Sequence, residues 1–370
     1  MDSIINIVDY SLLCGLGSNN EEVLNALSNG KTSVKNRKEY LYPVSTFPDE
    51  WLKQVEEKDS KISLSFLQKS LILFIEKFIN SSPELKKILI EDKKNCIIYW
   101  STTKAGIGEN VYNLNSFLKE VLHYFSWETL PNRIVSTACI SGGLALREAN
   151  EELKISDKKH AIIIAFDFLS PFIMDGFNAF KALSDSVCMP FHPERKGLNL
   201  GEAMAAMVLT KDNNRSFKAS VLASAGTNDA NHLSGPSRTG EELAKAIELC
   251  FKNHCTSDLQ FVMAHGTATL FNDEMESKAH YLSGLGSVPF IAPKYYLGHS
   301  LGASALVEII LGLLILENNI TIPHPYFSED ENPIFNKRVY SEFDNSKSKR
   351  FIKTASGFGG CNIALLLELH

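Results

Sequence analysis

The sequence lacks the motifs by which proteins usually bind nucleotides, structural metals or nucleic acids. It has no P-loop pattern, and no Gly-x-Gly-x-x-Gly motif follows an expected strand, so no nucleotide cofactor is indicated. Its seven cysteines are irregularly spaced and form no Cys-x-x-Cys pair. That pattern argues against disulfides and a zinc site, and it predicts a reduced, cytoplasmic protein. Lys and Arg number 37 against 43 Asp and Glu, and the resulting net charge of −6 is atypical of nucleic-acid binders.

Segments that would target or anchor the chain to a membrane are also missing. The first residues contain no basic segment followed by an apolar one, so we expect no signal peptide. The longest apolar stretch, residues 301–316, is interrupted by Glu308 and is too short to cross a bilayer. We therefore expect these residues to form a buried helix, and we expect no membrane span.

Short apolar runs, typical of buried strands, alternate along the chain with segments whose apolar residues recur at helical spacing. This pattern indicates an α/β fold with sheets covered on both faces. Hydrophobic residues make up 44% of the 370 residues, and this length predicts two domains or one large duplicated domain. The expected strands are residues 4–8, 95–100, 133–136, 161–165, 203–209, 217–224, 261–264, 351–355 and 363–369. The expected helices are residues 64–79, 111–125, 142–153, 241–251 and 301–316.

Two polar segments interrupt this alternation. Residues 27–62 are rich in Lys, Ser, Asn and Asp without a clear period, and we expect a surface excursion there. A short polar gap at residues 212–214 separates two expected strands. We place the division between an N-terminal half, 1–213, and a C-terminal half, 214–370, at this gap.

Cys139 stands where an expected strand passes into a helix that begins with small residues. Residues 133–136 precede it as a strand, and Gly142 and Gly143 follow it. This arrangement places the sulfur over free backbone N–H groups, and the helix dipole is expected to lower the pKa of the thiol and favour the thiolate. Cysteine is also a common small core residue, so a packing role alone is the alternative.

Two histidines and a glycine-rich turn occupy comparable positions in the second half of the chain. His265 ends an apolar strand and is followed by Gly266, which directs it towards the crevice where open α/β sheets bind ligands. His299 lies in a second glycine-flanked turn, although either histidine alone could be an ordinary core or surface residue. Three glycines within residues 356–362 leave backbone N–H groups free, and this turn could hold an oxyanion or be a plain tight turn.

The order of four motifs resembles one enzyme family. The chain reads Thr-Ala-Cys up to Cys139, His-Gly-Thr-x-Thr from His265, Lys-x-x-x-Gly-His-Ser-Leu-Gly-Ala from Lys294, and Gly-Phe-Gly-Gly-x-Asn from Gly357. This order resembles the β-ketoacyl-acyl-carrier-protein synthases of the thiolase superfamily, and more narrowly the elongating members that use Cys, His and His. Supporting matches lie at residues 14–17, 190–197 and 201–203, and the resemblance covers essentially the whole chain.

The resemblance implies both a fold and a reaction. In the thiolase-like fold, two similar halves, each with a mixed five-stranded sheet, stack as helix, sheet, helix, sheet and helix layers, and two chains form a dimer across a sheet edge. The reaction is the decarboxylative condensation of an acyl chain held on Cys139 with malonyl-acyl-carrier protein. It would give a β-ketoacyl-acyl-carrier protein in fatty-acid, polyene or polyketide-like synthesis. The phosphopantetheine arm would arrive on the carrier protein, so no further cofactor is expected.

The resemblance assigns the central roles in this chemistry to four residues. Cys139 would be the nucleophile that attacks the acyl thioester. His265 and His299 would be neutral imidazoles whose Nε2–H groups stabilise the enolate left by decarboxylation of the malonyl group. The backbone N–H groups of Cys139 and Phe358 would form the oxyanion hole for the condensation step.

The resemblance also implies supporting and substrate-binding residues. Lys294 matches the family's active-site lysine, and Glu276 matches its acidic partner. Glu308, within an apolar helix, needs a partner and matches an acid that lies near a structural ion or water cluster. The expected substrate contacts are the gate of the acyl pocket at Phe358, the hydroxyls of the phosphopantetheine channel at Thr267 and Thr269, and Ile140 after the nucleophile.

Three positions depart from the family pattern. Ile140 replaces a residue that is usually small, Ser356 replaces a usual Phe, and Ala203 replaces a usual Gly. We therefore expect an acyl pocket of unusual shape and a specialised pathway, such as aryl polyene or polyketide-like lipid synthesis. An acyl-carrier protein is acidic and would dock on a basic patch. The candidate docking residues are Lys58, Lys61 and Lys119.

Other interpretations of the same motifs stay open. A degradative thiolase would need a second catalytic cysteine, for which Cys361 is superficially placed, but the two-histidine pattern favours condensation. An initiating synthase would have Asn in place of His299. A chain-length-factor-like subunit would usually lack the nucleophile that Cys139 provides. We expect either a homodimer or a heterodimer with a related synthase subunit.

Overall fold

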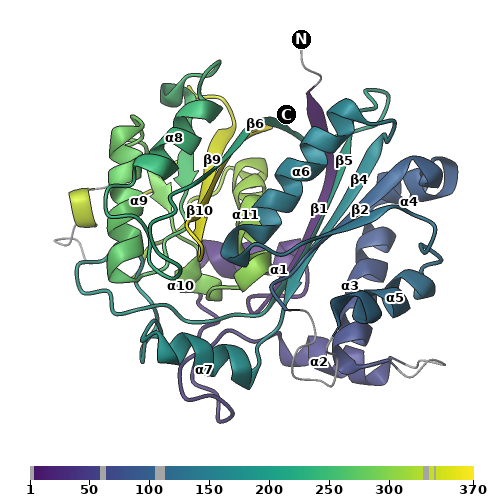
Figure 1. Ribbon diagram of the computed structural model, residues 1–370, viewed down its shortest axis with the longest axis horizontal. Coiled ribbons are helices and arrows are strands. Elements are labelled where there is room, and N and C mark those ends of the chain that lie inside the picture. The colour runs from purple at the N-terminus through teal and green to yellow at the C-terminus, as the bar shows by residue number, and fades with distance from the viewer. Residues whose placement is uncertain (1–3, 59–63, 105–112, 328–332, 337–338) are drawn as a thin grey trace.

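Within the part of the chain that the structure describes, ten strands form one continuous sheet that consists of two five-stranded sets (Figure 1). The computed structural model describes residues 4–58, 64–104, 113–327, 333–336 and 339–370. The first set comprises β1 (Ile5–Cys14), β2 (Cys96–Ser101), β3 (Asn132–Val135), β4 (His160–Asp167) and β5 (Ala203–Thr210). The second set comprises β6 (Ala219–Asn228), β7 (Phe261–Met263), β8 (Phe290–Ile291), β9 (Arg350–Gly357) and β10 (Cys361–Leu369).

The two sets repeat the same strand order and the same strand directions. The first is arranged β3-β2-β4-β5-β1, and the second, read from its outer edge, is β8-β7-β9-β10-β6. In each set the first three strands are parallel and the last two pairings are antiparallel. The sets join where Ile5–Ile7 of β1 pair with residues 219–221 of β6.

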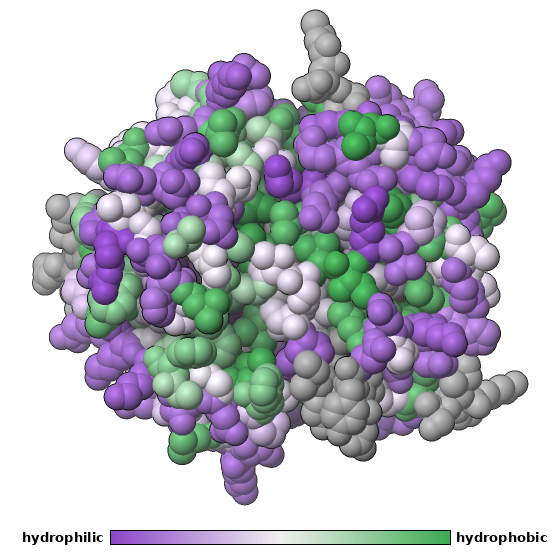
Figure 2. Space-filling view, in the orientation of Figure 1, coloured by the Kyte–Doolittle hydropathy of each residue, from purple (hydrophilic) through white to green (hydrophobic). Residues whose placement is uncertain are grey.

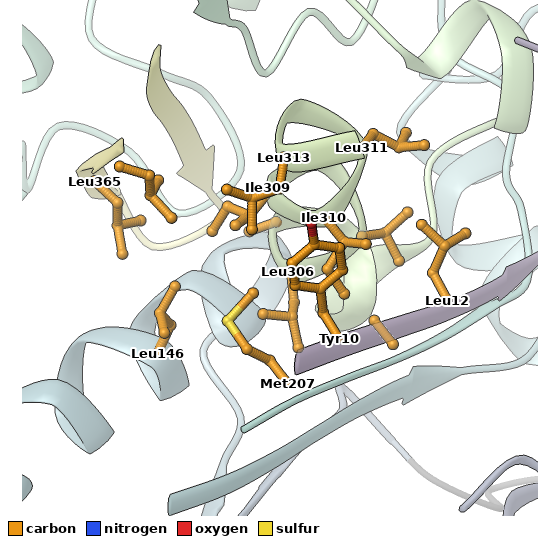
Figure 3. Close-up of a cluster of buried hydrophobic side chains, with 14 of the residues drawn as sticks. Tyr10, Leu12, Leu146, Met207, Leu306, Ile309, Ile310, Leu311, Leu313 and Leu365 are labelled. Carbon is orange, nitrogen blue, oxygen red and sulfur yellow. The ribbon is translucent and has the colours of Figure 1, made fainter. Parts of the chain in front are cut away.

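Two helices fill the space between the sets. They are α6 (Ser141–Ile155) and α11 (Ser304–Asn318), which lie in the centre of Figure 1. Because α11 is apolar around its whole circumference, it is stable only when buried on every side. Figure 3 shows its side chains between Tyr10 of β1, Leu146 of α6, Met207 of β5 and Leu365 of β10, so both sets of strands and both helices share this inner core.

Each set buries its other face under outer helices. Along β4, Ile163 faces the inner core, whereas Ile162 and Ile164 face outwards, as the two-residue period of a strand requires. The outer core of the first set lies under α3 (Phe66–Ser81), α4 (Pro83–Glu91) and α5 (Leu114–Tyr124). That of the second set lies under α8 (Glu241–Cys250) and α9 (Leu270–Leu282). The result is the predicted five-layer, thiolase-like architecture.

Most of the expected elements are present, but one prediction was wrong. Residues 27–62 are not only a surface excursion, because they contain α2 (Asp49–Glu57), in which Trp51 and Val55 are buried. Only three apolar residues, Trp51, Leu52 and Val55, mark this helix within a charged segment. Five further elements were not predicted from the sequence: α4, α7 (Pro171–Ala179), α9, the short α10 (Lys294–Leu297) and the two-residue strand β8. Residues 301–318 have the length and apolarity of a membrane span, yet 89% of that stretch is buried inside the protein.

A substitution at Gly142 tests how closely the two central helices, α6 and α11, must approach each other. A Cβ at Gly142 of α6 would lie 2.9 Å from the backbone N of Leu306 in α11. We expect Gly142→Ala to lower the free energy of unfolding by about 1–3 kcal/mol through overpacking, measured by denaturant titration.

The matched control is Gly176 of α7, where an added Cβ meets nothing within 4 Å. Gly176→Ala is expected to leave stability unchanged or to raise it by up to about 1 kcal/mol, because alanine favours a helix more than glycine does. Equal effects of the two substitutions would contradict this account of the helix contact.

Candidate active site

Cys139 occupies a tight turn between β3 and α6. The turn is a 3-10 segment, Ala138–Ile140, in which Ala138 has φ of 45°, a left-handed conformation that costs energy for a residue with a side chain. The hydroxyl of Ser141 stabilises the turn because it accepts from the backbone N–H of Thr137 at 2.8 Å and donates to the carbonyl of Ala138 at 2.6 Å. This turn places Cys139 just before the N-terminus of α6.

His265 is held through its backbone by a carboxylate from α9. The N–H groups of His265 and Gly266 donate to Oε1 and Oε2 of Glu276 at 2.7 and 2.8 Å. The hydroxyl of Thr354 on β9 donates to the same carboxylate at 2.7 Å. Gly266 has φ of 46°, and a Cβ there would lie 2.9 Å from side-chain atoms of Ala292, so the loop requires glycine.

The hydrogen bonds at Nδ1 define the tautomers of both histidines. The backbone N–H of Leu301 donates to Nδ1 of His299 at 3.1 Å, and Nζ of Lys294 lies 3.2 Å from Nδ1 of His265. An Nδ1 atom that accepts a hydrogen bond carries no proton, so the neutral ring carries its proton on Nε2. Both imidazoles can therefore donate a hydrogen bond from Nε2.

The three side chains meet in one place. The sulfur of Cys139 and a ring nitrogen from each of His265 and His299 all lie within 4.8 Å of one another. The two imidazole rings are 5.4 Å apart and nearly perpendicular. Burial holds the pKa of each histidine well below its usual value, and the charge of Lys294 acts in the same direction. The site therefore contains two neutral donors beside a sulfur.

A buried charge network lies next to the histidines. Nζ of Lys294 donates to Oε1 of Glu308 at 2.6 Å and to the backbone carbonyl of His265 at 2.5 Å. The other carboxylate oxygen of Glu308 lies 2.5 Å from Nζ of Lys353. All three charged side chains are fully buried. Burial alone would raise the pKa of Glu308, but the two lysines hold it below its usual value.

The predicted thiolate at Cys139 was wrong for the protein without substrate. Burial raises the pKa of this thiol to about 12, although the charge of Lys294 acts in the opposite direction. Loss of water around the sulfur is the largest cause of this shift. Cys139 is thus a protonated thiol at neutral pH.

A cavity of about 310 Å³ opens onto the three central side chains. Its lining includes Thr267 and Thr269, whose hydroxyls are 2.8 Å apart, and the ring of Phe358. Phe358 is partly exposed and contacts Phe177 and Phe180 of the α7 region at 5.8 and 5.6 Å between ring centres. Figure 2 shows apolar surface gathered across the middle of this face of the molecule.

The backbone of the glycine-rich turn lies against Cys139. A Cβ at Gly357 would be 3.3 Å from the backbone N of Cys139, a tight contact that would require a shift of a few tenths of an ångström. Phe358 follows directly, in the turn between β9 and β10. The turn thus brings the main chain beside Phe358 to the N-terminal end of α6.

Two expected contacts are corrected by the structure. Glu276 is not the partner of Lys294, because its carboxylate binds the backbone of His265 and Gly266, whereas Glu308 binds Lys294. Ile140 belongs to the inner core and is not among the residues that line the cavity, although its side chain packs beside Gly357, which is.

Sequence reasoning missed two residues on β9 that complete the site. They are Lys353 and Thr354, which bind Glu308 and Glu276. A lysine inside the apolar run Phe-Ile-Lys-Thr-Ala was the available signal. The acid at Glu308 has two lysines as partners, where the resemblance suggested an ion or water cluster.

Two domain families of β-ketoacyl synthases match this chain. The family "Beta-ketoacyl synthase, N-terminal domain" matches residues 129–214, and "Beta-ketoacyl synthase, C-terminal domain" matches residues 218–328. A mitochondrial 3-oxoacyl-[acyl-carrier-protein] synthase of Arabidopsis thaliana is 28% identical, over 64% of this chain and 56% of its own length. The tetracenomycin ketoacyl synthase alpha subunit of Streptomyces glaucescens is 29% identical, over 64% of this chain and 60% of its own.

Solved structures of low sequence identity share the fold. The ishigamide ketosynthase/chain length factor has a TM-score of 0.87 at 19% identity, with both chains fully covered. A chain of the ketosynthase ApeO in complex with its chain length factor ApeC, from Xenorhabdus doucetiae, has a TM-score of 0.83 at 21% identity, covering 100% of this chain and 98% of that one. The chain spans less than two thirds of the length of the curated relatives it matches.

Alkylation across a range of pH tests the protonation state of Cys139. Since its thiol pKa lies near 12, the thiolate fraction should rise about tenfold per pH unit between pH 7 and pH 9. We expect the rate of iodoacetamide alkylation at Cys139, followed by peptide mass spectrometry, to rise in the same proportion.

Cys255 is the internal comparison for this experiment, because it is exposed and a hydrogen bond from Ser257 lowers its pKa. Its alkylation should be faster than that of Cys139 at pH 7 and should level off at a lower pH. A rate at Cys139 that stays constant from pH 7 to pH 9 would contradict the protonated thiol.

Proposed function

We propose, since the chain belongs to the β-ketoacyl synthase family, that it catalyses a decarboxylative Claisen condensation. First, the sulfur of Cys139 attacks an acyl thioester on a carrier protein, the carrier thiol leaves, and the acyl group stays on the cysteine. Next, malonyl-carrier protein loses CO₂ and becomes an enolate. Its carbon attacks the acyl-cysteine, so that a C–C bond forms, the C–S bond to Cys139 breaks and the released sulfur regains a proton.

The observation that carries this proposal is the pair of neutral Nε2–H donors beside the sulfur. Decarboxylation places negative charge on the thioester oxygen, and two neutral donors in a dry site stabilise that charge before the reaction begins. The hydrogen bonds at Nδ1 of His265 and His299 already hold both rings in the donating tautomer. A general base would require a free Nε2, which neither ring provides in this arrangement.

The oxyanion hole for the condensation step is proposed at the backbone N–H groups of Cys139 and Phe358. The close approach of Gly357 to the amide of Cys139 supports this assignment. One such donor contributes about 3 kcal/mol to stabilising the transition state. Lys294 and Glu276 are then positioning residues, because they hold His265 through its ring, its carbonyl and its backbone N–H.

The carrier arm is proposed to enter past Thr267 and Thr269, and the ring of Phe358 would gate the acyl pocket. Two exposed lysines, Lys181 and Lys196, line the same cavity, and they are better placed to receive an acidic carrier protein than the lysines suggested by sequence. Of those, Lys58 forms an ion pair with Glu76 at 2.6 Å, Lys119 is exposed outside the cavity lining, and Lys61 lies outside the described residues.

The pathway and the assembly are proposed on narrower grounds. Ser356 lines the cavity, and relatives are named as a 3-oxoacyl-[acyl-carrier-protein] synthase and as a subunit of a polyketide synthase, which supports an unusual acyl chain of a polyene or polyketide-like pathway. The edge strand β3 has exposed residues and could pair with a second copy or a related subunit. A chain-length-factor-like role stays the alternative. The cytoplasmic location, the absence of a further cofactor or metal, and the division at residues 213 and 214 stay predictions.

Covalent loading of the nucleophile is the direct test. We expect intact-mass spectrometry, after mixing with acyl-carrier proteins of saturated and unsaturated chains, to show one acyl adduct that Cys139→Ala abolishes. The matched control is Cys361→Ser, which removes the second cysteine that a degradative thiolase would use, and this variant should keep the adduct. An adduct that survives Cys139→Ala would mean that another residue is the nucleophile.

Separate assays of the two half-reactions test the histidines. His299→Ala and His265→Ala should each slow decarboxylation of malonyl-carrier protein by about 10²–10³-fold, the usual loss for one donor to a developing oxyanion. Loading of Cys139 should persist, since neither ring needs to accept the thiol proton. His123→Gln, at an exposed site on α5, is the control and should change neither rate. Loss of loading together with decarboxylation would assign the histidines to activation of the sulfur instead.

A further inference from the structure

A second buried lysine stands beside the proposed catalytic groups. Lys353 lies in β9 between Phe351 and Ala355 on the inner face, and it is fully buried. Its Nζ is 2.5 Å from Oε2 of Glu308 and 3.2 Å from the carbonyl oxygen of Ala264. A buried ammonium is costly unless it is paired, so its presence in an apolar strand calls for an explanation.

Lys353 changes how the charges of the network balance. Glu308 carries one negative charge between two lysines, and Ser304 donates to the oxygen that Lys294 also binds. Glu308 and Lys294 alone would have no net charge. Lys353 gives the three side chains together a net charge of one positive unit. The titratable groups around the two imidazoles are Cys139 before α6, Asp167 at the end of β4, Glu276 of α9, Lys294 of α10, Glu308 of α11 and Lys353 of β9.

We propose that Lys353 is a positioning residue for this site: it occupies the second oxygen of Glu308, keeps Lys294 directed at His265, and opposes protonation of both imidazoles by its charge. With Oε2 occupied, Lys294 needs to satisfy only Oε1, and its remaining donors reach the ring nitrogen and the carbonyl of His265. The proposal rests on the proposed function, because it assigns a purpose to neutral histidines.

The direction of the electrostatic effect agrees with this geometry. Burial is the main cause that lowers the pKa of His265 and of His299, and the charges of Lys294 and Lys353 lower both further. Removing the charge of Lys353 should therefore raise both pKa values. An imidazole with a raised pKa becomes protonated at a higher pH, so activity that needs the neutral ring should fail earlier as the pH decreases.

The test compares the wild-type protein with Lys353→Met, Lys353→Gln and Lys353→Arg. In wild type, we expect NMR titration to show that His265 and His299 stay neutral well below the usual titration range of a histidine. In Lys353→Met and Lys353→Gln, the titration and the acidic limb of malonyl decarboxylation should both move up by about one pH unit. Lys353→Arg keeps the charge and should keep the wild-type limb, even if its longer side chain lowers stability.

Several results would overturn the proposal. One is that His265 and His299 of the wild-type protein titrate near pH 6.5. Another is that the acidic limb of decarboxylation stays in place in Lys353→Met and Lys353→Gln. A third is that this limb moves equally in Lys353→Arg. If Lys353→Met does not fold, Lys353→Gln serves, because its amide still donates towards Glu308. The double variant Lys353→Met/Glu308→Gln restores the excess of one positive charge, and its limb should return towards that of wild type.

The NMR titration separates this proposal from the proposed function. It needs no substrate and reads the histidines of the resting protein directly. A wild-type protein that neither loads acyl groups nor decarboxylates malonyl-carrier protein would contradict the proposed function. A shifted titration in the same protein would still support the role of Lys353.

Discussion

Close contact between the two halves, at the N-terminal ends of α6 and α11, is the constraint on which the site depends. Gly142 lies so near α11 that a Cβ would be 2.9 Å from the backbone of Leu306. The N–H of Gly302, in the turn before α11, donates to Asp167 at the end of β4 at 2.7 Å. Because Cys139 precedes α6 and His299 precedes α11, the spacing of these helices sets the spacing of sulfur and imidazole.

Burial has opposite consequences for the two kinds of side chain at this contact. It removes water from His265 and His299 and holds them neutral, which suits donors to an enolate oxygen. The same burial raises the pKa of Cys139, so the two neutral donors do not lie beside a free thiolate. In the proposed acylation step, the thiol proton would therefore have to leave as the sulfur attacks, while the proposed oxyanion donors stabilise the charge on the thioester oxygen.

Local sequence predicted most of the elements and the central residues, but not their charge partners. Cys139 and His265 could be found because each lies at the end of a strand, and such ends meet in an α/β sheet. His299 could be found because it lies in a glycine-flanked turn, here between α10 and α11. The partner of Lys294 could not be found, since Glu276 and Glu308 both lie in helices at plausible spacing. Which of them faces the lysine depends on how α9 and α11 pack against opposite faces of the second set of strands.

The protonation state of the Cys139 thiol could not be predicted from the sequence for a related reason. A helix dipole is visible in the sequence because it depends on neighbours along the chain, whereas burial depends on the segments that cover the turn. Gly357, more than 200 residues away, lies against the amide of Cys139. Likewise, α2 was missed because Trp51 is buried by α3. The indole N–H of Trp51 donates to the hydroxyl of Ser70 in α3.

Strand β9 shows why the two supporting carboxylates cannot be treated as independent. Consecutive residues of a strand point to opposite faces, so Lys353 reaches Glu308 in the inner layer while Thr354 reaches Glu276 in the outer one. One strand thus supports His265 twice: through Lys294 at its ring and carbonyl, and through Glu276 at its backbone N–H. A shift of β9 by one residue would exchange the two faces and remove both supports together. The register of this strand is therefore as much a part of the site as the side chains that touch the sulfur.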